Sequence, residues 1–196
     1  AAGLNFRDVI RALGMLQEYE ASIGITSVDD VTFGFECSGV VTAIGSDVSD
    51  YKVGDEVLAL ALGSLSSHVT VATDYVVRKP EAMSFVEAAT IPLAFATAYY
   101  GLEELAKIQA GDRVLIHSAA GGVGQAAVEL CRGVNAEVLA TASKGKWKFL
   151  ESMGVQQVMD SRTLDFSEQI LSQTNGGVDV VLNSLNGEYI PKSLAT

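Results

Sequence analysis

The stretch Arg113–Arg132, "RVLIHSAAGGVGQAAVELCR", begins as an apolar run, passes through small residues, and continues with helical spacing. Apolar residues then recur at i, i+3, i+4, i+7, i+8 and i+11, namely Val123, Ala126, Ala127, Leu130, Cys131 and Val134. This pattern predicts a strand, then a turn made of small Ala and Gly residues (the bare turn), and then a helix with one apolar face. It also places Cys131 in the core as a small packed residue.

Strand and helix patterns alternate from about Pro92 onward. The predicted strands are Val114–His117, Glu137–Ala142, Gln157–Ser161 and Val178–Leu185. A further helix is expected from about Phe166, with Asp165 as its N-cap and Glu168 completing a variant of the capping box. Alternation of this kind predicts an α/β fold with a parallel sheet and right-handed crossovers.

The segment from Phe33 to Lys79 differs in composition and in the length of its apolar runs. It is rich in Val and Gly, and turn formers separate the short runs "CSGVVTAIG", "VGDEVLALAL" and "SSHVTVATDYVV". Such runs are typical of short antiparallel strands. Two partial domains are therefore expected.

Charge and cysteine content exclude several classes of function. Thirteen Lys and Arg against 24 Asp and Glu give a net charge of −11, which argues against nucleic-acid binding. Apolar stretches such as "TIPLAFATAYYGL" are shorter than the roughly 20 residues of a membrane span. Cys37 and Cys131 form no disulfide framework, so we expect a reducing, cytoplasmic setting with no membrane partner. Because the chain opens without Met and closes within a helical pattern, we interpret it as part of a longer protein.

The bare turn matches a dinucleotide fingerprint. Ala119, Gly121 and Gly124 occupy the positions of GxGxxG, with Ala in place of the first Gly. Glycines there permit a tight turn and close approach of a pyrophosphate to backbone N–H groups, and the helix N-terminus favours the phosphates. The strand, turn and helix setting favours a nucleotide site over a purely structural turn.

The end of the second predicted strand indicates which nucleotide is bound. An NAD site usually carries an acidic residue there, whereas this chain reads "ATASKGKWKF". Ser143 and Lys146, together with Arg162 after the third strand, are candidates for binding a 2′-phosphate. Lys144 and Lys148 are interpreted as solvated surface cations. The favoured cofactor is NADPH.

Several longer segments together resemble a known family. "AAGLNFRDVIRALGM", "FECSGVVTAIG", "ATASKGKWKFL", "SRTLDF" and "VDVVLNSLNGE" are similar to the enoyl reductase domains of modular polyketide synthases and animal-type fatty acid synthases, in the medium-chain dehydrogenase/reductase superfamily. The resemblance implies a partial GroES-like substrate domain over residues 1–92, truncated at its N-terminus. It implies a partial Rossmann NADPH-binding domain over residues 93–196, truncated at its C-terminus.

The resemblance also implies roles for individual residues. Asn5 would face the substrate and the nicotinamide, and Asn183 and Ser184 would lie near the nicotinamide. The implied cofactor-binding set is Thr97, Ala119, Gly121, Gly122, Val123, Gly124, Ser143, Lys146, Arg162, Asn183, Ser184 and Leu185. The implied partners are an acyl carrier protein bearing an enoyl thioester and the neighbouring synthase domains.

The chain departs from zinc-dependent relatives, which carry a Gly-His-Glu motif where it reads Gly34, Phe35 and Glu36. His68 and His117 are isolated in the sequence, and we interpret both as packed, hydrogen-bonded residues rather than ligands. We therefore expect no metal site. Reduction of a conjugated C=C bond requires a hydride, donors for an enolate oxygen and a proton, and none of these requires a metal.

The proton donor differs from the family pattern as well. Many polyketide enoyl reductases have Tyr directly after the Met of the "ALGM" segment, but Leu16 follows here and Tyr19 is out of register. The family's candidate Lys would lie in a strand after Thr196. Two alternatives stay open: a free-standing NADPH quinone or enone oxidoreductase, and a reductase-like module that binds nucleotide as a scaffold without turnover.

Overall fold

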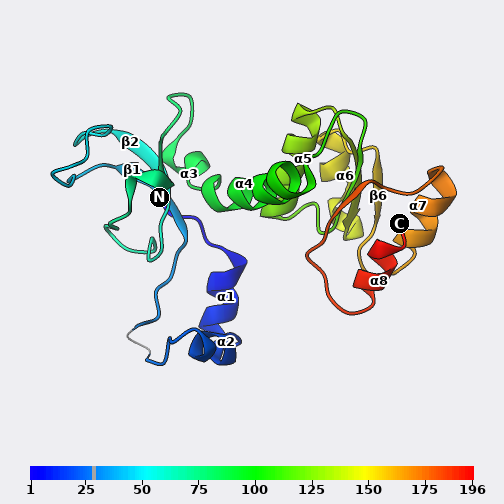
Figure 1. Ribbon diagram of the computed structural model, residues 1–196, viewed down its shortest axis with the longest axis horizontal. Helices are drawn as coiled ribbons and strands as arrows, with labels where there is room; N and C mark the ends of the chain where they lie inside the picture. The colour runs from blue at the N-terminus through cyan, green and yellow to red at the C-terminus, as the bar shows by residue number, and fades with distance from the viewer. Residues whose placement is uncertain (28–29) are drawn as a thin grey trace. The chain divides into compact units, whose positions relative to one another are not determined.

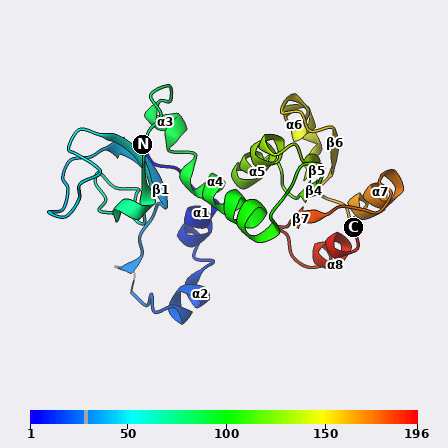
Figure 2. The same ribbon diagram turned by 45° about the horizontal axis from the view of Figure 1, so that its top comes forward.

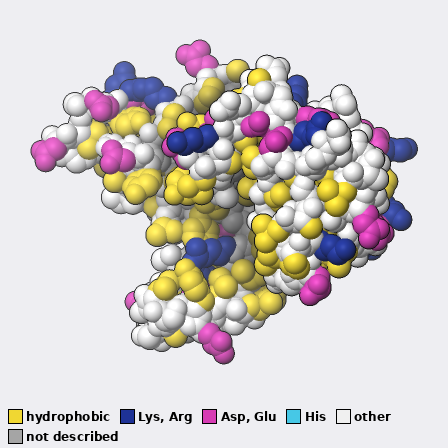
Figure 3. All heavy atoms as spheres, turned by 45° about the vertical axis from the view of Figure 1, so that its right-hand side comes forward, with side chains coloured by type: hydrophobic (Ala, Val, Ile, Leu, Met, Phe, Trp, Pro, Cys, Tyr) yellow, Lys and Arg dark blue, Asp and Glu magenta, His cyan; other side chains and the backbone are white. Residues whose placement is uncertain are grey.

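The chain folds into two compact units, Ala1–Leu93 and Ala94–Thr196 (Figure 1). The computed structural model describes residues 1–27 and 30–196. Within those residues, no helix has the length and apolar character needed to cross a membrane. Acidic side chains lie at scattered positions on the visible face rather than in one patch (Figure 3).

The first unit contains a small antiparallel sheet in the order β1-β2-β3. Its strands are β1 (Glu36–Val40), β2 (Glu56–Leu60) and β3 (Val76–Arg78). Near the N-terminus, Ala2 forms an isolated antiparallel bridge to Cys37 beside β1. The helices are α1 (Phe6–Ala12), α2 (Gln17–Ser22), the 3-10 helix η2 (Thr73–Tyr75) and α3 (Phe85–Ala88). Helix α4 (Pro92–Tyr99) begins at the end of this unit.

Part of the strand prediction for the first unit is wrong. The alternating segment "SSHVTVATDYVV" forms a strand only at its end, in β3, because only Val76–Arg78 pairs with β2. His68 lies in the irregular part, where it is exposed and contacts Ser67 Oγ through Nδ1 at 3.3 Å. The expectation that His68 is packed is therefore wrong.

The second unit is built on a parallel sheet in the order β6-β5-β4-β7 (Figure 2). The strands are β4 (Arg113–Ile116), β5 (Glu137–Ala142), β6 (Gln157–Asp160) and β7 (Val180–Leu182). The intervening helices are η3 (Tyr100–Ala106), a π-helix, α5 (Gly122–Gly133), the 3-10 helix η4 (Lys144–Lys146), α6 (Trp147–Ser152), α7 (Phe166–Gln173) and α8 (Tyr189–Leu194). This architecture confirms the predicted α/β fold with a parallel sheet.

Alternate strand residues bury themselves on opposite faces of the parallel sheet. Val114, Ile116 and Ala140 belong to a core cluster that includes residues of α4, α5 and α6. Leu115 and Leu139 belong to a second cluster, which includes residues of α7 and α8. Both faces are therefore covered, as the near-continuous apolar strands require. Cys131 is fully buried in the first cluster, which confirms its core position.

Two local predictions in this unit need correction. The predicted strand Val178–Leu185 shortens to Val180–Leu182 because Asn183 turns the chain through its own side chain. Asp165 is the N-cap of α7, as predicted, and its carbonyl accepts from Gln169 N–H at 3.0 Å. Its backbone has helical dihedrals, with φ −66° and ψ −17°, and its side chain makes no cap hydrogen bond with a described residue, so the predicted capping box with Glu168 does not form.

Candidate cofactor-binding site

The turn between β4 and α5 exposes backbone rather than side chains. Gly121 is the N-cap of α5 and has no side chain to satisfy the first N–H groups of that helix. The opening N–H groups of any helix lack intrahelical partners and favour anions. A Cβ added at Gly121 would come within 3.3 Å of the Ser118 carbonyl oxygen. The turn is therefore bare because the backbone folds tightly back on itself, and its free donors suit a phosphate group.

Gly124 and Ala119 explain how α5 packs against the strand. A Cβ at Gly124 would lie 2.5 Å from Ala119 Cα and 2.6 Å from both its carbonyl carbon and oxygen. Ala can replace the first Gly of the fingerprint because Ser118, with φ +53°, adopts the left-handed backbone, whereas Ala119 does not. Ala119 N–H donates to the Thr141 carbonyl at 3.0 Å and so joins the turn to β5.

The carboxyl ends of all four parallel strands meet at one edge of the sheet. Ala119 follows β4, Ser143 follows β5, Arg162 follows β6 and Asn183 follows β7. From β4 the chain proceeds to β5 and β6 on one side, and β7 returns on the other. Such a reversal of strand order is where open α/β sheets bind ligands. The structure thus brings most of the predicted cofactor-binding residues to this edge.

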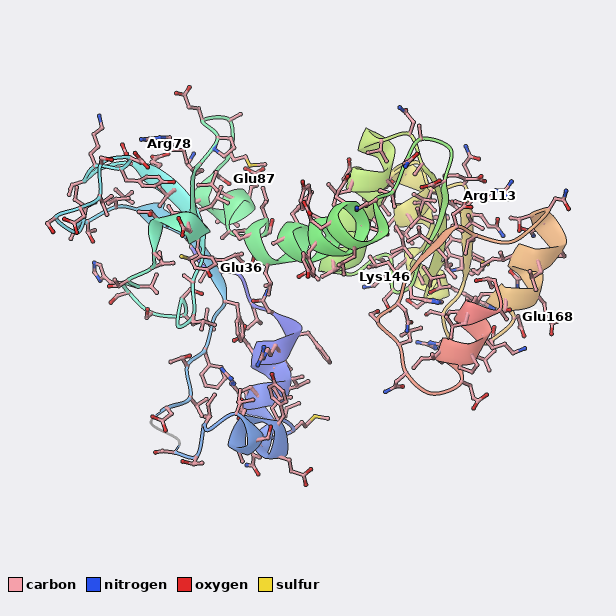
Figure 4. The ribbon with its side chains drawn as sticks, viewed as in Figure 1. Glu36, Arg78, Glu87, Arg113, Lys146 and Glu168 are labelled. Carbon is pink, nitrogen blue, oxygen red and sulfur yellow. The ribbon has the colours of Figure 1, made fainter. Side chains whose placement is uncertain are left out.

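Lys146 and Arg162 are exposed cations at this edge, and Figure 4 labels Lys146. Lys146 N–H donates to the Ser143 carbonyl at 2.8 Å, and Arg162 N–H donates to Asp160 Oδ1 at 3.0 Å, so both backbones are held. Neither side chain forms an ion pair with a described residue, whereas Lys144 lies 3.5 Å from Asp160. Lys146 and Arg162 therefore remain free to bind a phosphate.

The segment after β7 is shaped by an Asn183 turn. Asn183 Nδ2 donates to the Leu185 carbonyl and Leu185 N–H donates to Asn183 Oδ1, each at 3.0 Å. Asn183 and Ser184 are exposed and Leu185 is half-buried. Thr97 is exposed on α4.

His117 is a structural residue just below this edge, as predicted. Its Nδ1 lies 3.0 Å from Thr141 Oγ1 and its Nε2 lies 2.8 Å from Ser193 Oγ. The ring meets Phe166 edge-on, with centroids 4.9 Å apart. Burial lowers the pKa of His117 to about 4, because desolvation disfavours the charged imidazole. The side chain is thus a neutral hydrogen-bonding group in the core.

Asn5 in the first unit is held by two buried carboxylates. Its backbone N–H donates to Asp8 Oδ2 at 3.0 Å, and its side-chain Nδ2 donates to Glu36 Oε1 at 2.6 Å. Asp8 Oδ1 accepts from Gly34 N–H at 2.7 Å, which joins α1 to the turn before β1. Sequence reasoning missed Asp8 and Glu36 as partners of Asn5. Only the short spacing from Asn5 to Asp8, typical of a capping box, could have indicated the first of them.

Phe35 fills the position at which zinc-dependent relatives would carry a ligand. Its ring lies 5.3 Å from the Arg7 guanidinium and 5.8 Å from that of Arg11. The same Arg7 guanidinium is 5.6 Å from the Tyr19 ring. No group of three or more His, Cys, Asp or Glu side chains that could hold a metal occurs in residues 1–27 and 30–196. The zinc-free site stays a prediction.

Comparisons with known proteins are consistent with both units. The family described as "Alcohol dehydrogenase GroES-like domain" matches residues 1–81, and that described as "Zinc-binding dehydrogenase" matches residues 122–196. The phenolphthiocerol synthesis polyketide synthase Pks15/1 of Mycobacterium marinum is 45% identical over 99% of this chain, which spans 9% of that protein. 

Solved structures extend the similarity to the fold of the whole chain. CurK enoyl reductase is 61% identical with a TM-score of 0.94, and the match covers 99% of this chain and 59% of that one. The CurF ER cyclopropanase of the curacin A biosynthetic pathway is 50% identical with a TM-score of 0.90, covering 99% and 60%. The chain therefore spans less than two thirds of these solved domains.

Proposed function

Since the chain belongs to the enoyl reductase domains of polyketide synthases, in the medium-chain dehydrogenase/reductase superfamily, we propose that it forms part of an NADPH-dependent enoyl reductase. Its substrate is the C=C bond of an α,β-unsaturated acyl thioester on an acyl carrier protein, reduced during polyketide chain extension. The observation that carries the cofactor assignment is the bare N-terminus of α5 at the edge where four strand ends meet. The partners proposed are the carrier protein and neighbouring synthase domains.

The residues of the second unit suit NADPH. The free N–H groups at Gly122 and Val123 would hold the pyrophosphate, while Lys146 and Arg162 would hold the 2′-phosphate. Bound NADPH supplies the hydride that is added to the β-carbon of the enoyl thioester. In this assignment the Asn183 turn lies toward the nicotinamide, and Asn5 serves the substrate side.

A spectrophotometric assay tests the reaction. The intact protein that contains this chain is mixed with NADPH and a trans-2-enoyl thioester or, separately, a quinone, and loss of NADPH absorbance is followed. We expect turnover with the thioester and a product that has gained two hydrogens by mass spectrometry. Because a 50% identical relative carries the name cyclopropanase, the product mass is needed as well as the rate. Reduction of the quinone alone would favour an oxidoreductase, and NADPH binding without turnover would favour a scaffold module.

Cofactor selectivity tests the phosphate assignment separately. A charge-assisted hydrogen bond contributes about 1.5 to 3 kcal/mol, so Lys146→Ala or Arg162→Ala should each lower the preference for NADPH over NADH roughly 10- to 100-fold. Lys148→Ala is the matched control, because Lys148 is an exposed cation on α6 and is assigned no phosphate. Unchanged selectivity in both test variants would remove the basis for choosing NADPH.

A further inference from the structure

We propose that His117 is a positioning residue for cofactor binding, which acts through the Thr141 hydroxyl to hold Ser118 and the bare turn that follows it. This role rests on the proposed function, because it concerns how the fold maintains the pyrophosphate side of the cofactor site. The residues involved all lie in the second unit, at the end of β4, on β5 and on α8.

Ser118 is the residue at which the chain turns from β4 toward α5. It is exposed, and its φ of +53° lies in the left-handed region, which a residue with a Cβ seldom adopts. Such a backbone persists where the surrounding contacts hold it. The Ser118 carbonyl accepts from Gly121 N–H at 2.9 Å, so the conformation of Ser118 sets how the bare turn enters α5. The contacts that hold Ser118 therefore determine the shape of the turn.

Thr141, which is fully buried on β5, holds the turn at two successive residues. Its Oγ1 accepts from Ser118 N–H at 3.4 Å, and its carbonyl accepts from Ala119 N–H at 3.0 Å. The bond to Ser118 is longer than the common length of about 2.9 to 3.0 Å, so it depends on the hydroxyl presenting a lone pair rather than its hydrogen. The direction of the hydroxyl is decided by its other partner, His117 Nδ1, which is 3.0 Å away.

The hydrogen bonds of the His117 ring run in one direction. Ser193 Oγ donates its hydrogen to the Tyr189 carbonyl at 2.7 Å, so it must accept from His117 Nε2, which is 2.8 Å away. Burial lowers the pKa of His117 to about 4, so the ring is neutral at neutral pH and carries a single N–H. Its Nδ1 therefore has a lone pair and accepts the hydrogen of Thr141 Oγ1. The lone pairs of the Thr141 hydroxyl are left to face Ser118 N–H.

These hydrogen bonds connect the turn to α8, which covers the same face of the sheet as α7 (Figure 2). His117 is 3% exposed and Ser193 is 4% exposed, so both polar side chains are shielded from solvent. A buried polar group that loses its partner is destabilising, and an apolar side chain could fill the same space without that penalty. Packing alone therefore does not require His here, whereas a chain of hydrogen bonds from α8 to Ser118 needs a side chain that donates on one side and accepts on the other.

Removal of the Thr141 hydroxyl in the intact protein tests the link to the turn. Thr141→Val keeps the shape of the side chain, and the Kd for NADPH in a fluorescence titration should rise about 5- to 10-fold, because the turn spends less time in the binding conformation. Hydrogen exchange of the peptide that contains the turn should be faster in the same variant. Thr141→Ser restores the hydroxyl and should return both measurements close to their wild-type values. An unchanged Kd in Thr141→Val would overturn the inference.

Thr174→Val is the matched control for removing a hydroxyl that accepts from the backbone. Thr174 follows α7, and its Oγ1 accepts from Gly177 N–H at 3.0 Å and donates to the Ile170 carbonyl at 2.7 Å. The control should melt at a lower temperature than the wild type, as Thr141→Val should, but its Kd for NADPH should stay close to the wild-type value. A rise in Kd as large as that of Thr141→Val would show that general destabilisation, rather than the turn, explains the effect.

Two substitutions of His117 separate the roles of its two ring nitrogens. An Asn side chain places its carbonyl oxygen near the position of Nδ1, whereas the longer Gln side chain places its NH₂ group near the position of Nε2. Each variant leaves one former partner unpaired, so both should melt at a lower temperature than the wild type. His117→Asn still accepts from Thr141 and should keep the Kd for NADPH close to the wild-type value, whereas His117→Gln should raise it as Thr141→Val does. Equal Kd values for the two His117 variants would overturn the positioning role.

Ser193→Ala gives a second reading if a His117 variant does not fold. It removes the acceptor of the Nε2 hydrogen, so the ring is free to carry its hydrogen on Nδ1 instead, where it no longer accepts from Thr141. The Kd for NADPH should rise to a value between those of the wild type and Thr141→Val, with no further rise in the Thr141→Val background. An unchanged Kd in Ser193→Ala would overturn the role of His117. Failure of the wild-type protein to bind NADPH would instead remove the proposed function and, with it, this inference.

Discussion

Replacing Gly124 by Ala tests whether the close packing of α5 against the turn builds the nucleotide site. The added Cβ would lie 2.5 to 2.6 Å from three backbone atoms of Ala119, so the backbone has to shift. Overpacking of this kind costs about 1 to 3 kcal/mol, and the intrinsic helix gain of Ala over Gly, about 1 kcal/mol, offsets only part of it. Since Ala119 belongs to the turn that would hold the pyrophosphate, we expect the Kd for NADPH to rise at least about 10-fold.

Gly133→Ala is the control, because Gly133 is the last residue of the same helix. Apart from the local helix backbone, a Cβ added at Gly133 has no heavy atom of a described residue within 4 Å. The control should be neutral or stabilise the fold by up to about 1 kcal/mol, with an unchanged Kd. Thermal unfolding and NADPH titration of the intact protein measure both effects, and the two melting temperatures should differ by several degrees, at about 2 to 4 °C per kcal/mol. A Gly124→Ala protein that melts no lower than the control and binds NADPH within twofold of wild type would refute the packing argument.

Three further predictions follow from other residues. His117 is neutral in the fold because its pKa is lowered to about 4, so the unfolded state takes up a proton first as the pH falls below 6.5. The free energy of unfolding should therefore drop by up to about 3 kcal/mol between pH 6.5 and 4. Chemical denaturation across that range measures the drop, and His117→Gln should lack the part that His117 contributes. Burial raises the pKa of Cys131 to about 11 and raises that of Cys37 as well; iodoacetamide at neutral pH should leave Cys131 unmodified by mass spectrometry until the protein is unfolded. Chelators should leave enoyl reduction intact and elemental analysis should find no stoichiometric zinc, whereas one metal per chain would contradict the prediction drawn from Phe35.

Local patterns predicted the second unit well because its strands and helices follow from periodicity. Cys131 and His117 could be placed correctly since each lies within a regular apolar run. The same reasoning failed for "SSHVTVATDYVV", because alternation indicates a half-buried strand but not whether a partner strand is present; only Val76–Arg78 has one. Asp165 is the N-cap of α7, but the predicted capping box does not form, because residue type and spacing do not determine the backbone dihedrals that a side-chain cap requires.

The contacts around Asn5 could not be predicted from sequence for a different reason. Asn5 and Glu36 are 31 residues apart, and their hydrogen bond depends on how the N-terminal segment lies beside β1. The family resemblance implied that Asn5 is functional but gave no reason for its orientation. That orientation follows from the chemistry of its partner, which can only accept, and such partners become visible only when tertiary contacts are known.

The uneven distribution of charge is compatible with the proposed binding of an anionic cofactor by so acidic a chain. Residues 1–93 contain 13 Asp and Glu but only 5 Lys and Arg. Residues 94–196 contain 11 Asp and Glu and 8 Lys and Arg. The excess negative charge therefore falls mainly in the first unit, where Asp8 and Glu36 act as internal hydrogen-bond acceptors rather than as surface charges. Half of the cations of the second unit lie between residues 144 and 162, beside the carboxyl ends of β5 and β6. Since exposed charges beyond about 8 to 10 Å are screened at physiological ionic strength, this local cluster, rather than the net charge of −11, determines the electrostatics at a bound phosphate.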